Sequence, residues 1–145
     1  MINLIHTFLS IAFLFLNKPE NPLPGKLEIS VEGIEKNKGK ILLAIYESEK
    51  GFPSGHEQAI KSLEGVPQNG KCKFIISDLK TGKYAFSLFH DLNGDKKLNT
   101  NMIGIPKEGY AFSNNAKGKF GPPSFQDAAF QLKDNTLQQI KMIYW

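Results

Sequence analysis

Residues 84–101 read YAFSLFHDLNGDKKLNTN, and this stretch holds the pattern that decides the fold beside the most distinctive polar sequence of the chain. Tyr84, Phe86 and Leu88 place a large apolar side chain at every second position, which is the period of a β-strand with one face in a core. The apolar pattern ends at His90, and polar residues follow. The stretch therefore predicts a strand that leads into a polar loop.

Side chains that carry oxygen occupy alternate positions of this loop, around a glycine. They are Asp91, Asn93, Asp95, Asn99 and Asn101. Such spacing is typical of calcium loops, whose ligands are oxygen atoms. The twelve-residue EF-hand pattern has glycine and a bidentate glutamate where this chain has Lys96 and Met102. Two interpretations stay open: a weak calcium site formed by these five residues, or a polar turn, because Asp, Asn and Gly also favour turns for local reasons.

The two-residue period recurs on both sides of this stretch. It is present in residues 27–31, 72–76 and 128–132, whereas residues 41–46 form an unbroken apolar run. Such a run is typical of a central strand that is covered on both faces. A last strand is expected over residues 137–145. Strands separated by short turns, without a long helix, predict an all-β fold, an antiparallel β-sandwich of about seven strands.

Two segments interrupt the strands. Ser54 stands three residues before Glu57, as in a helix-capping box, so one short helical insertion is expected to continue through Lys61. Residues 103–124 have no period and are rich in glycine and proline, which predicts a long ordered loop. Its aromatic residues either close one end of the core, which we favour, or form an exposed platform for a glycan or a peptide.

Leu79, Gly82 and Tyr84 have the spacing of the tyrosine corner of immunoglobulin-like sandwiches, in which a tyrosine hydroxyl bonds to nearby backbone. Residues 77–82 break the alternation and are expected to form the turn before the strand. An ordinary half-buried tyrosine is the alternative, and both interpretations stay open.

The N-terminal residues have the composition of an export signal. Residues 1–16 are mostly apolar, too short and too polar for a membrane span, and suit the core of a signal peptide. Residues 17–25 are rich in proline and predict an extended linker, so residues 26–145 are expected to form a single domain. The sequence therefore predicts export to the periplasm or the cell surface, with no stable membrane span after signal removal. A buried amphipathic helix is the alternative for residues 1–16.

All 18 basic residues of this 145-residue chain are lysines, and its formal net charge is +4. Arginine is the residue best suited to bidentate recognition of phosphates and guanine edges, so its absence argues against a nucleic-acid partner. The lysines are dispersed, which is typical of a solvated surface. Cys72 is the single cysteine, so no internal disulfide can form, and we expect it to pack on a strand face as a small hydrophobe.

Four motifs follow one another from the end of the strand to residue 125. They are His90-Asp91-x-Asn93-Gly94-Asp95, Gly104-Ile105-Pro106-Lys107-Glu108-Gly109-Tyr110, Phe112-Ser113-Asn114-Asn115 and Phe120-Gly121-Pro122-Pro123-Ser124-Phe125. Together they resemble the bacterial family catalogued as domain of unknown function 2141. The resemblance implies an exported protein with a transthyretin-like or immunoglobulin-like β-sandwich, and it implies no established activity. It also implies an aspartate near Asn99 and a glycine near Lys96, where this chain departs from the family.

Two classes of function fit these features. The first is a non-enzymatic binding or structural module of the cell envelope, in which residues of the loop hold it in place or contact a ligand. These residues are His90, Lys107, Glu108, Tyr110, Phe112 and Asn114. The second is a hydrolase-type enzyme with His90 as general base, Asp91 orienting it, and Glu108 as a second acid or a metal ligand. We favour the module, because the sequence contains no catalytic motif.

A purely structural role would use a free sheet edge, which the sequence places at Lys26 or at the last strand. The envelope ligand, with a glycan or a peptide as candidates, and the oligomeric state are not determined by the sequence.

Overall fold

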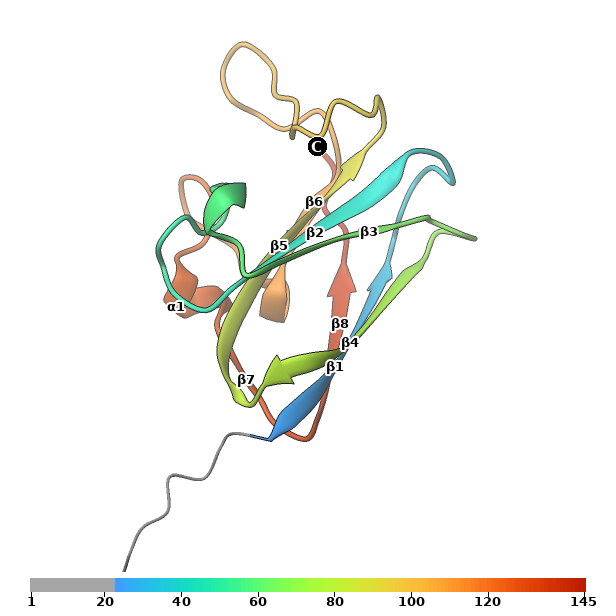
Figure 1. Cartoon of the computed structure of the whole chain (residues 1–145). Helices are drawn as coiled ribbons and strands as arrows, with labels where there is room; N and C mark the ends of the chain where they lie inside the picture. The colour runs from blue at the N-terminus through green and yellow to red at the C-terminus, as the bar shows by residue number, and fades with distance from the viewer. Residues whose placement is uncertain (1–22) are drawn as a thin grey trace, which may run out of the picture.

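The computed structural model describes residues 23–145, which form eight strands in two sheets and three short helical segments (Figure 1). The strands are β1 (Pro24–Glu32), β2 (Lys40–Tyr46), β3 (Lys61–Gly65), β4 (Cys72–Lys80), β5 (Gly82–Asp91), β6 (Tyr110–Phe112), β7 (Phe130–Leu132) and β8 (Asn135–Lys141). The helical segments are the 3-10 turns η1 (His56–Gln58) and η2 (Ser113–Asn115) and the α-helix α1 (Phe125–Ala128). The predicted all-β fold is confirmed.

The predicted signal peptide, residues 1–16, lies outside the described residues, as do residues 17–22 of the predicted linker. The last two linker residues, Pro24 and Gly25, belong to β1 instead. Within residues 23–145, no helix has the length and the apolar character to cross a membrane.

The two sheets have the strand orders β4-β1-β8 and β3-β2-β5-β6, and β7 pairs with β5. Paired strands are antiparallel except β1 and β8, which run parallel from the Lys26/Asn135 pair to the Glu32/Lys141 pair. The predicted antiparallel arrangement is therefore wrong for this one pair. Parallel neighbours need a long crossover, and here most of the domain supplies it. β1 is central in its sheet, so the prediction of a free edge at Lys26 is also wrong.

One core cluster unites residues of both sheets, because alternate residues of the long strands point to the same side. Leu27, Ile29 and Val31 of β1 are fully buried and share this cluster with Phe86 and Leu88 of β5. Burying an aliphatic or phenyl side chain contributes about 1.5–3 kcal/mol, so this cluster stabilises the packing of the two sheets. The two-residue period of apolar residues in the sequence is the reason that these side chains reach one core.

Cys72 of β4 belongs to the same cluster, as expected for a small hydrophobe. Burial raises the pKa of its thiol. The thiol therefore stays protonated and is a poor nucleophile at neutral pH.

A second apolar cluster covers the other face of β2 and β5. Tyr46 is fully buried there, and the ring of Phe52 packs edge-on against it with the ring centroids 5.5 Å apart. Phe125 of α1 also packs against Phe52, at 5.9 Å between centroids. The prediction that residues 41–46 form a central strand with two covered faces is confirmed, since this cluster supplies the second cover.

The predicted break at residues 77–82 is wrong, because β4 continues through most of this segment. β4 carries one extra residue relative to β1 between the pairs Leu27/Ile76 and Gly25/Leu79. This bulge shifts the phase of the strand, so that Ile76 and Leu79 are both buried although they are three residues apart. The alternation of buried and exposed positions is therefore interrupted in the sequence, although strand β4 continues.

The predicted helical insertion is reduced to the single turn η1, and the capping box is wrong because no side chain caps it. Lys61 already belongs to β3, a strand that the sequence does not predict because Lys61–Gly65 contains no fully buried residue. A capped helix occurs instead at α1, where Ser124 Oγ accepts a hydrogen bond from the Asp127 amide at 3.1 Å. Residue 128, assigned to a strand from the sequence, ends this helix.

The tyrosine-corner hydrogen bond is confirmed. The hydroxyl of Tyr84 donates to the Lys80 carbonyl oxygen at 2.9 Å, directly across the turn between β4 and β5. The bond fixes the tight connection between the two sheets.

The last strand ends earlier than predicted, at Lys141. The tail that follows crosses to the other sheet, where Ile143 and Tyr110 exchange two backbone hydrogen bonds of 2.9 and 3.0 Å. The tail thus brings Tyr144 and Trp145 beside β6 and next to the polar loop, at the end of the domain opposite the start of β1 (Figure 1).

Candidate functional site

The polar loop starts at Asp91, the last residue of β5, whose carboxylate is almost fully buried. One carboxylate oxygen accepts the Gly94 amide at 2.8 Å and the other accepts the Lys96 amide at 3.0 Å. Lys96 has a φ of +60°, the left-handed conformation that favours glycine. The chain therefore adopts a glycine-like turn at the position where the EF-hand pattern has its glycine, although the residue is lysine.

The side chains that follow bind one another and the backbone. Asn93 Oδ1 accepts the Asp95 amide at 3.3 Å, and Asn93 Nδ2 donates to Asn99 Oδ1 at 3.1 Å. Asp95 accepts from Asn99 Nδ2 at 2.8 Å and from the Lys97 amide at 2.9 Å. These bonds, with that of Asn99 first, lower the pKa of the Asp95 carboxyl below its ordinary value. The alternating residues thus form a hydrogen-bond network within the loop.

Glu108 closes the loop from its far end. Its side chain is buried, and its two oxygens accept the amides of Leu92 and Asn99, each at 3.0 Å. Asn101 plays a similar part in the middle, where Oδ1 accepts the amides of Ile103 and Ile105 at 3.0 and 2.9 Å. We call residues 91–108 the polar loop, and its shape is fixed by carboxylate and amide oxygens that bind backbone N–H groups.

Five residues were predicted as calcium ligands: Asp91, Asn93, Asp95, Asn99 and Asn101. All five lie together in the polar loop, and each accepts or donates a hydrogen bond there. Residues 23–145 contain no group of three or more His, Cys, Asp or Glu side chains arranged to hold a metal ion. A carboxylate oxygen that accepts one hydrogen bond keeps a second lone pair, so calcium binding stays a prediction.

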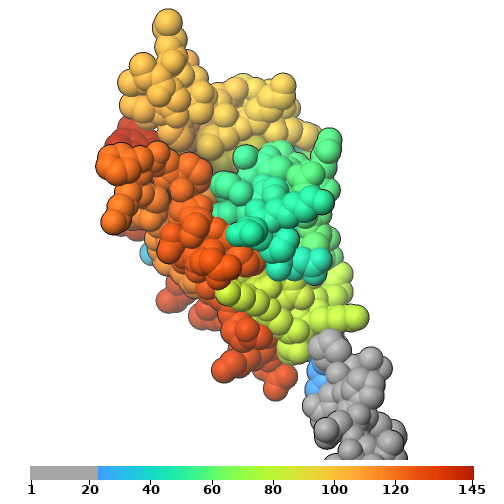
Figure 2. Space-filling model, turned by 90° about the vertical axis from the view of Figure 1, so that its left-hand side faces the viewer, coloured from blue at the N-terminus to red at the C-terminus, as the bar shows by residue number. Residues whose placement is uncertain are grey.

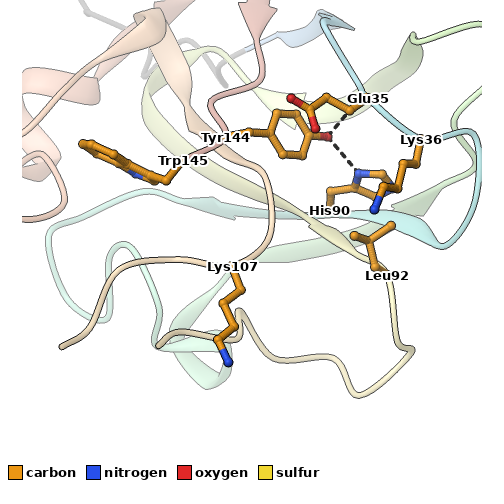
Figure 3. A pocket seen from close by; sticks show the side chains of 7 residues that line it. All are labelled: Glu35, Lys36, His90, Leu92, Lys107, Tyr144 and Trp145. Atoms are coloured by element: carbon orange, nitrogen blue, oxygen red, sulfur yellow. Dashed lines mark hydrogen bonds between the residues drawn. The ribbon is translucent and has the colours of Figure 1, made fainter. Parts of the chain in front are cut away.

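His90 is fully buried at the base of the polar loop, and both of its ring nitrogens have hydrogen-bond partners, of which Figure 3 draws Tyr144. Nε2 lies 2.7 Å from the Lys38 carbonyl oxygen, which can only accept, so Nε2 carries the proton. Nδ1 then accepts from the Tyr144 hydroxyl at 2.8 Å, and that hydroxyl accepts the Glu35 amide at 3.4 Å. Burial raises the pKa of Tyr144, which keeps its hydroxyl protonated as this arrangement needs.

A cavity of about 190 Å³ opens beside this histidine, and Figure 3 shows its lining. Lys107 reaches it from the polar loop and Trp145 from the C-terminal tail. Gly109 lies against Tyr144 so closely that an added Cβ would collide with the tyrosine ring. A larger residue at position 109 would therefore force the Tyr144 ring, which binds His90, to shift. Tyr144 is a residue that no sequence motif singles out.

A larger groove of about 920 Å³ lies over the outer face of β5 and β6. Ser87, Phe89, Tyr110 and Phe112 form its floor, since Phe89 pairs with Tyr110 and Ser87 with Phe112 in the sheet. Three segments border it: residues 96–106 of the polar loop, residues 116–122, and residues 53–56. They meet on the face shown in Figure 2, in gold, orange and teal.

The rim of the groove exposes large apolar side chains. Phe120 and Ile103 are 104% and 80% exposed, and Trp145 is 82% exposed while its Nε1 donates to the Tyr110 hydroxyl at 2.8 Å. Leu98 and Ile105 add smaller exposed surfaces. Apolar side chains gathered around a hollow are typical of a binding surface and differ from isolated exposed residues, which are normal.

The remaining predicted residues fall in different places. Tyr110 and Phe112 lie in the groove, so the aromatic residues of the long segment are divided between a buried floor and an exposed rim. Asn114 does not line the groove: its Nδ2 binds the Ala128 and Ala129 carbonyl oxygens at 3.2 and 2.8 Å. Asn115 binds the backbone of β8 through Gln139 and Lys141. The Phe112-Ser113-Asn114-Asn115 motif thus connects the two sheets.

Residues 29–140 match the model of a protein family described as "Uncharacterized protein conserved in bacteria (DUF2141)". A search of the curated proteins and a search of the solved structures each gave no match. The match begins in β1 and ends in β8, and it includes the polar loop and both walls of the groove. Because these residues make up most of the chain, the protein belongs to the bacterial family DUF2141.

Proposed function

We propose that this domain is a non-enzymatic binding module that takes its ligand in the groove over β5 and β6. The observation that carries the proposal is a hollow of about 920 Å³ whose rim exposes Ile103, Phe120 and Trp145. Sites for small ligands have volumes of about 300–1,000 Å³ and a mostly apolar lining. Leaving such side chains in water is unfavourable, and a ligand that covers them gains the corresponding free energy.

The alternative is a hydrolase in which His90 is the general base. A general base needs a free lone pair within reach of the substrate. His90 is fully buried, its Nδ1 accepts from Tyr144, and its Nε2 donates to Lys38. Both oxygens of Glu108, the second proposed acid, accept backbone amides. These contacts support a structural role for both residues, so we favour the binding module.

We further propose that the module acts outside the cytoplasm, in the periplasm or at the cell surface. The support is the apolar composition of residues 1–16, which suits an export signal. β1 starts at the end of the domain opposite the polar loop, so the groove lies away from the point where the chain enters the domain (Figure 1). Fractionation of cells that produce the full chain with a C-terminal tag tests this: finding the protein only in the cytoplasm would contradict it.

The single tryptophan of the chain, Trp145, lines the groove and gives a direct test of binding. N-phenyl-1-naphthylamine, an uncharged apolar fluorophore, is titrated into the purified protein. We expect quenching of the Trp145 emission and a saturable rise in probe fluorescence. Ile103→Ser removes most of an exposed apolar side chain from the rim and is expected to weaken binding about fivefold.

Ile75→Ser is the matched control, because Ile75 is also an exposed isoleucine but lies on β4 in the other sheet. It is expected to leave probe binding unchanged. Equal losses in the two variants, or no saturable binding to the unaltered protein, would remove the groove as the site.

Calcium enters this proposal as a second component that stiffens the polar loop. With a Kd of about 1 mM, 10 mM calcium would stabilise the fold by about 1.4 kcal/mol. Thermal unfolding in chelator and in calcium measures this stabilisation. The proteins compared are the unaltered protein, Asp91→Ala and Asp95→Ala. If calcium does not raise the melting temperature, calcium does not stabilise the polar loop, and the loop is held by its own hydrogen bonds alone.

A further inference from the structure

We propose that the groove binds a single-chain amphiphilic carboxylate, a fatty-acid-like anion, with its chain on the aromatic floor and its head held by the lysines of the two walls. This proposal rests on the binding function proposed above for the same groove. It goes further by assigning the charge and the chemical class of the occupant.

The lining of the groove carries an excess of positive charge. Lys96 and Lys97 belong to the wall formed by the polar loop, and Lys117 and Lys119 belong to the wall formed by residues 116–122. The residues that line the groove include no aspartate and no glutamate. In the whole chain, 18 basic residues are nearly balanced by 14 acidic residues, whereas the four lysines of the lining are balanced by no acidic residue of the lining. A concave surface with one sign of charge attracts ligands of the opposite sign.

Three of these ammonium groups lack an ion-pair partner among the described residues. Lys96 Nζ lies 3.5 Å from Glu64, which also pairs with Lys40. The ion pairs within residues 23–145 include none at Lys97, Lys117 or Lys119.

Asp95 is the acidic residue nearest to Lys97 in the sequence, and the Lys97 charge helps to lower the pKa of the Asp95 carboxyl without forming an ion pair with it. Its oxygens accept hydrogen bonds from Asn99 and from the Lys97 amide, and it does not line the groove. The unpaired ammonium groups are therefore available to a ligand carboxylate.

The groove combines this positive charge with an apolar floor. Phe89, Tyr110 and Phe112 form a surface that suits an alkyl chain, and Ile103 and Phe120 stand at its two sides. A lysine carries a point charge without the planar fork of arginine, so it binds a lone carboxylate head without selecting a particular geometry. An amphiphile with one anionic head satisfies both parts of the lining, whereas an uncharged or a cationic one satisfies only the floor.

The test compares three ligands with the same twelve-carbon chain, each below its micelle concentration: dodecanoate, dodecanol and dodecyltrimethylammonium. The purified protein is titrated, and Trp145 emission and displacement of N-phenyl-1-naphthylamine are recorded. We expect dodecanoate to bind at least tenfold more tightly than dodecanol, and the cationic ligand to bind most weakly. A rise from 0.05 to 0.5 M NaCl is expected to weaken dodecanoate binding several-fold and to leave dodecanol unchanged, because salt screens exposed charges.

Lys117→Gln/Lys119→Gln removes two charges from one wall, and Lys71→Gln/Lys80→Gln removes two exposed charges from outside the groove as the matched control. The first pair is expected to weaken dodecanoate binding about three- to tenfold and to leave dodecanol unaffected, since an exposed charge contact is worth about a factor of five. The control pair is expected to leave both ligands unchanged. Lengthening the chain of the carboxylate is expected to tighten binding by about two- to fourfold per methylene.

The outcomes separate this proposal from the one on which it rests. Equal binding of dodecanoate and dodecanol would overturn the assignment of an anion and would leave the groove as an apolar site. Binding of none of the ligands, the naphthylamine probe included, would overturn both. Binding to vesicles of anionic phospholipid without any affinity for monomeric dodecanoate would overturn the fatty-acid-like occupant in favour of a membrane surface.

Discussion

The two walls of the groove are built in different ways. In the polar loop, residues 91–108, carboxylate and amide side chains bind the backbone repeatedly, with Glu108 and Asp91 buried beneath it. In the opposite wall, residues 117–122 make no hydrogen bond with any other described residue, and Ala116 bonds only to Ser113. The first wall is therefore preorganised, whereas the second can adjust to an occupant at low cost.

This difference explains why the polar motif residues His90, Asp91 and Glu108 do not line the groove that we propose as a binding surface. His90, Asp91 and Glu108 use their polar atoms to hold the loop, and the residues that the loop then presents are Lys97, Ile103 and their neighbours. In the function that we propose, these motif residues act by shaping the loop and not by contact with a ligand. Four measurements test whether the two walls differ in rigidity.

Glu108→Ala is expected to have the largest effect. It leaves the amides of Leu92 and Asn99 without their carboxylate partner, which costs about 2–4 kcal/mol for two charge-assisted hydrogen bonds. Urea unfolding measures this loss, and Glu49→Ala, at an exposed glutamate, is the control with an expected change under 0.5 kcal/mol. A small loss at Glu108 would mean that the polar loop is held by something other than its own side chains.

Gly109→Ala tests the support beneath the first wall. The added methyl group collides with the Tyr144 ring, so we expect a loss of about 1–3 kcal/mol and displacement of the tyrosine from His90. Gly82→Ala is the control, because a Cβ there meets only ordinary van der Waals contacts. Urea unfolding, with the NMR shift of the His90 ring as a local probe, compares the two variants. Equal stability would show that Tyr144 moves aside without cost.

Amide hydrogen exchange compares the walls directly. The amides of Lys97, Asn99 and Ile105 donate to side-chain oxygens, whereas those of Lys117 and Phe120 have no acceptor among the described residues. We expect at least about tenfold slower exchange in the first group. Equal rates in the two groups would contradict a preorganised polar loop, and saturating dodecanoate is expected to slow the second group alone.

The smallest expected effect is a pH dependence at Asp95. Because its folded pKa is lowered from 3.8, chiefly by the Asn99 amide, its contribution to stability is present above that value and is lost as the pH falls through the folded pKa. Asp95→Asn is therefore expected to reduce stability slightly at pH 7 and to converge with the unaltered protein near pH 2. Thermal unfolding between these limits measures it, and a constant difference across the range would exclude the carboxylate as the cause.

Much of the fold was predictable because the relevant information is local. A strand with one buried face needs an apolar residue at every second position, and Leu27, Ile29 and Val31 meet this condition without reference to any other part of the chain. Tyr84 was predictable in the same way, since its hydrogen bond to Lys80 spans only four residues. Local rules failed at residues 77–80, because the bulge in β4 depends on the register of β1.

The candidate site was predictable only in part. The polar loop itself could be found, because its oxygen-bearing residues lie within eleven positions and bind near neighbours. Their role was less accessible, since a calcium loop and a hydrogen-bonded turn use the same residue types. The groove was not predictable, because its floor comes from β5 and β6 while its walls come from separate loops.

Short-range patterns in the sequence specify an all-β domain with a polar loop after its longest strand, because alternation and turn chemistry act over a few residues. Three features depend on the packing of distant segments: β8 lies parallel to β1, Tyr144 binds His90 from 54 residues away, and Lys97 and Lys119 line one groove. Those placements depend on how two sheets and a C-terminal tail pack together. Packing is a property of the whole chain, and no short stretch of residues encodes it.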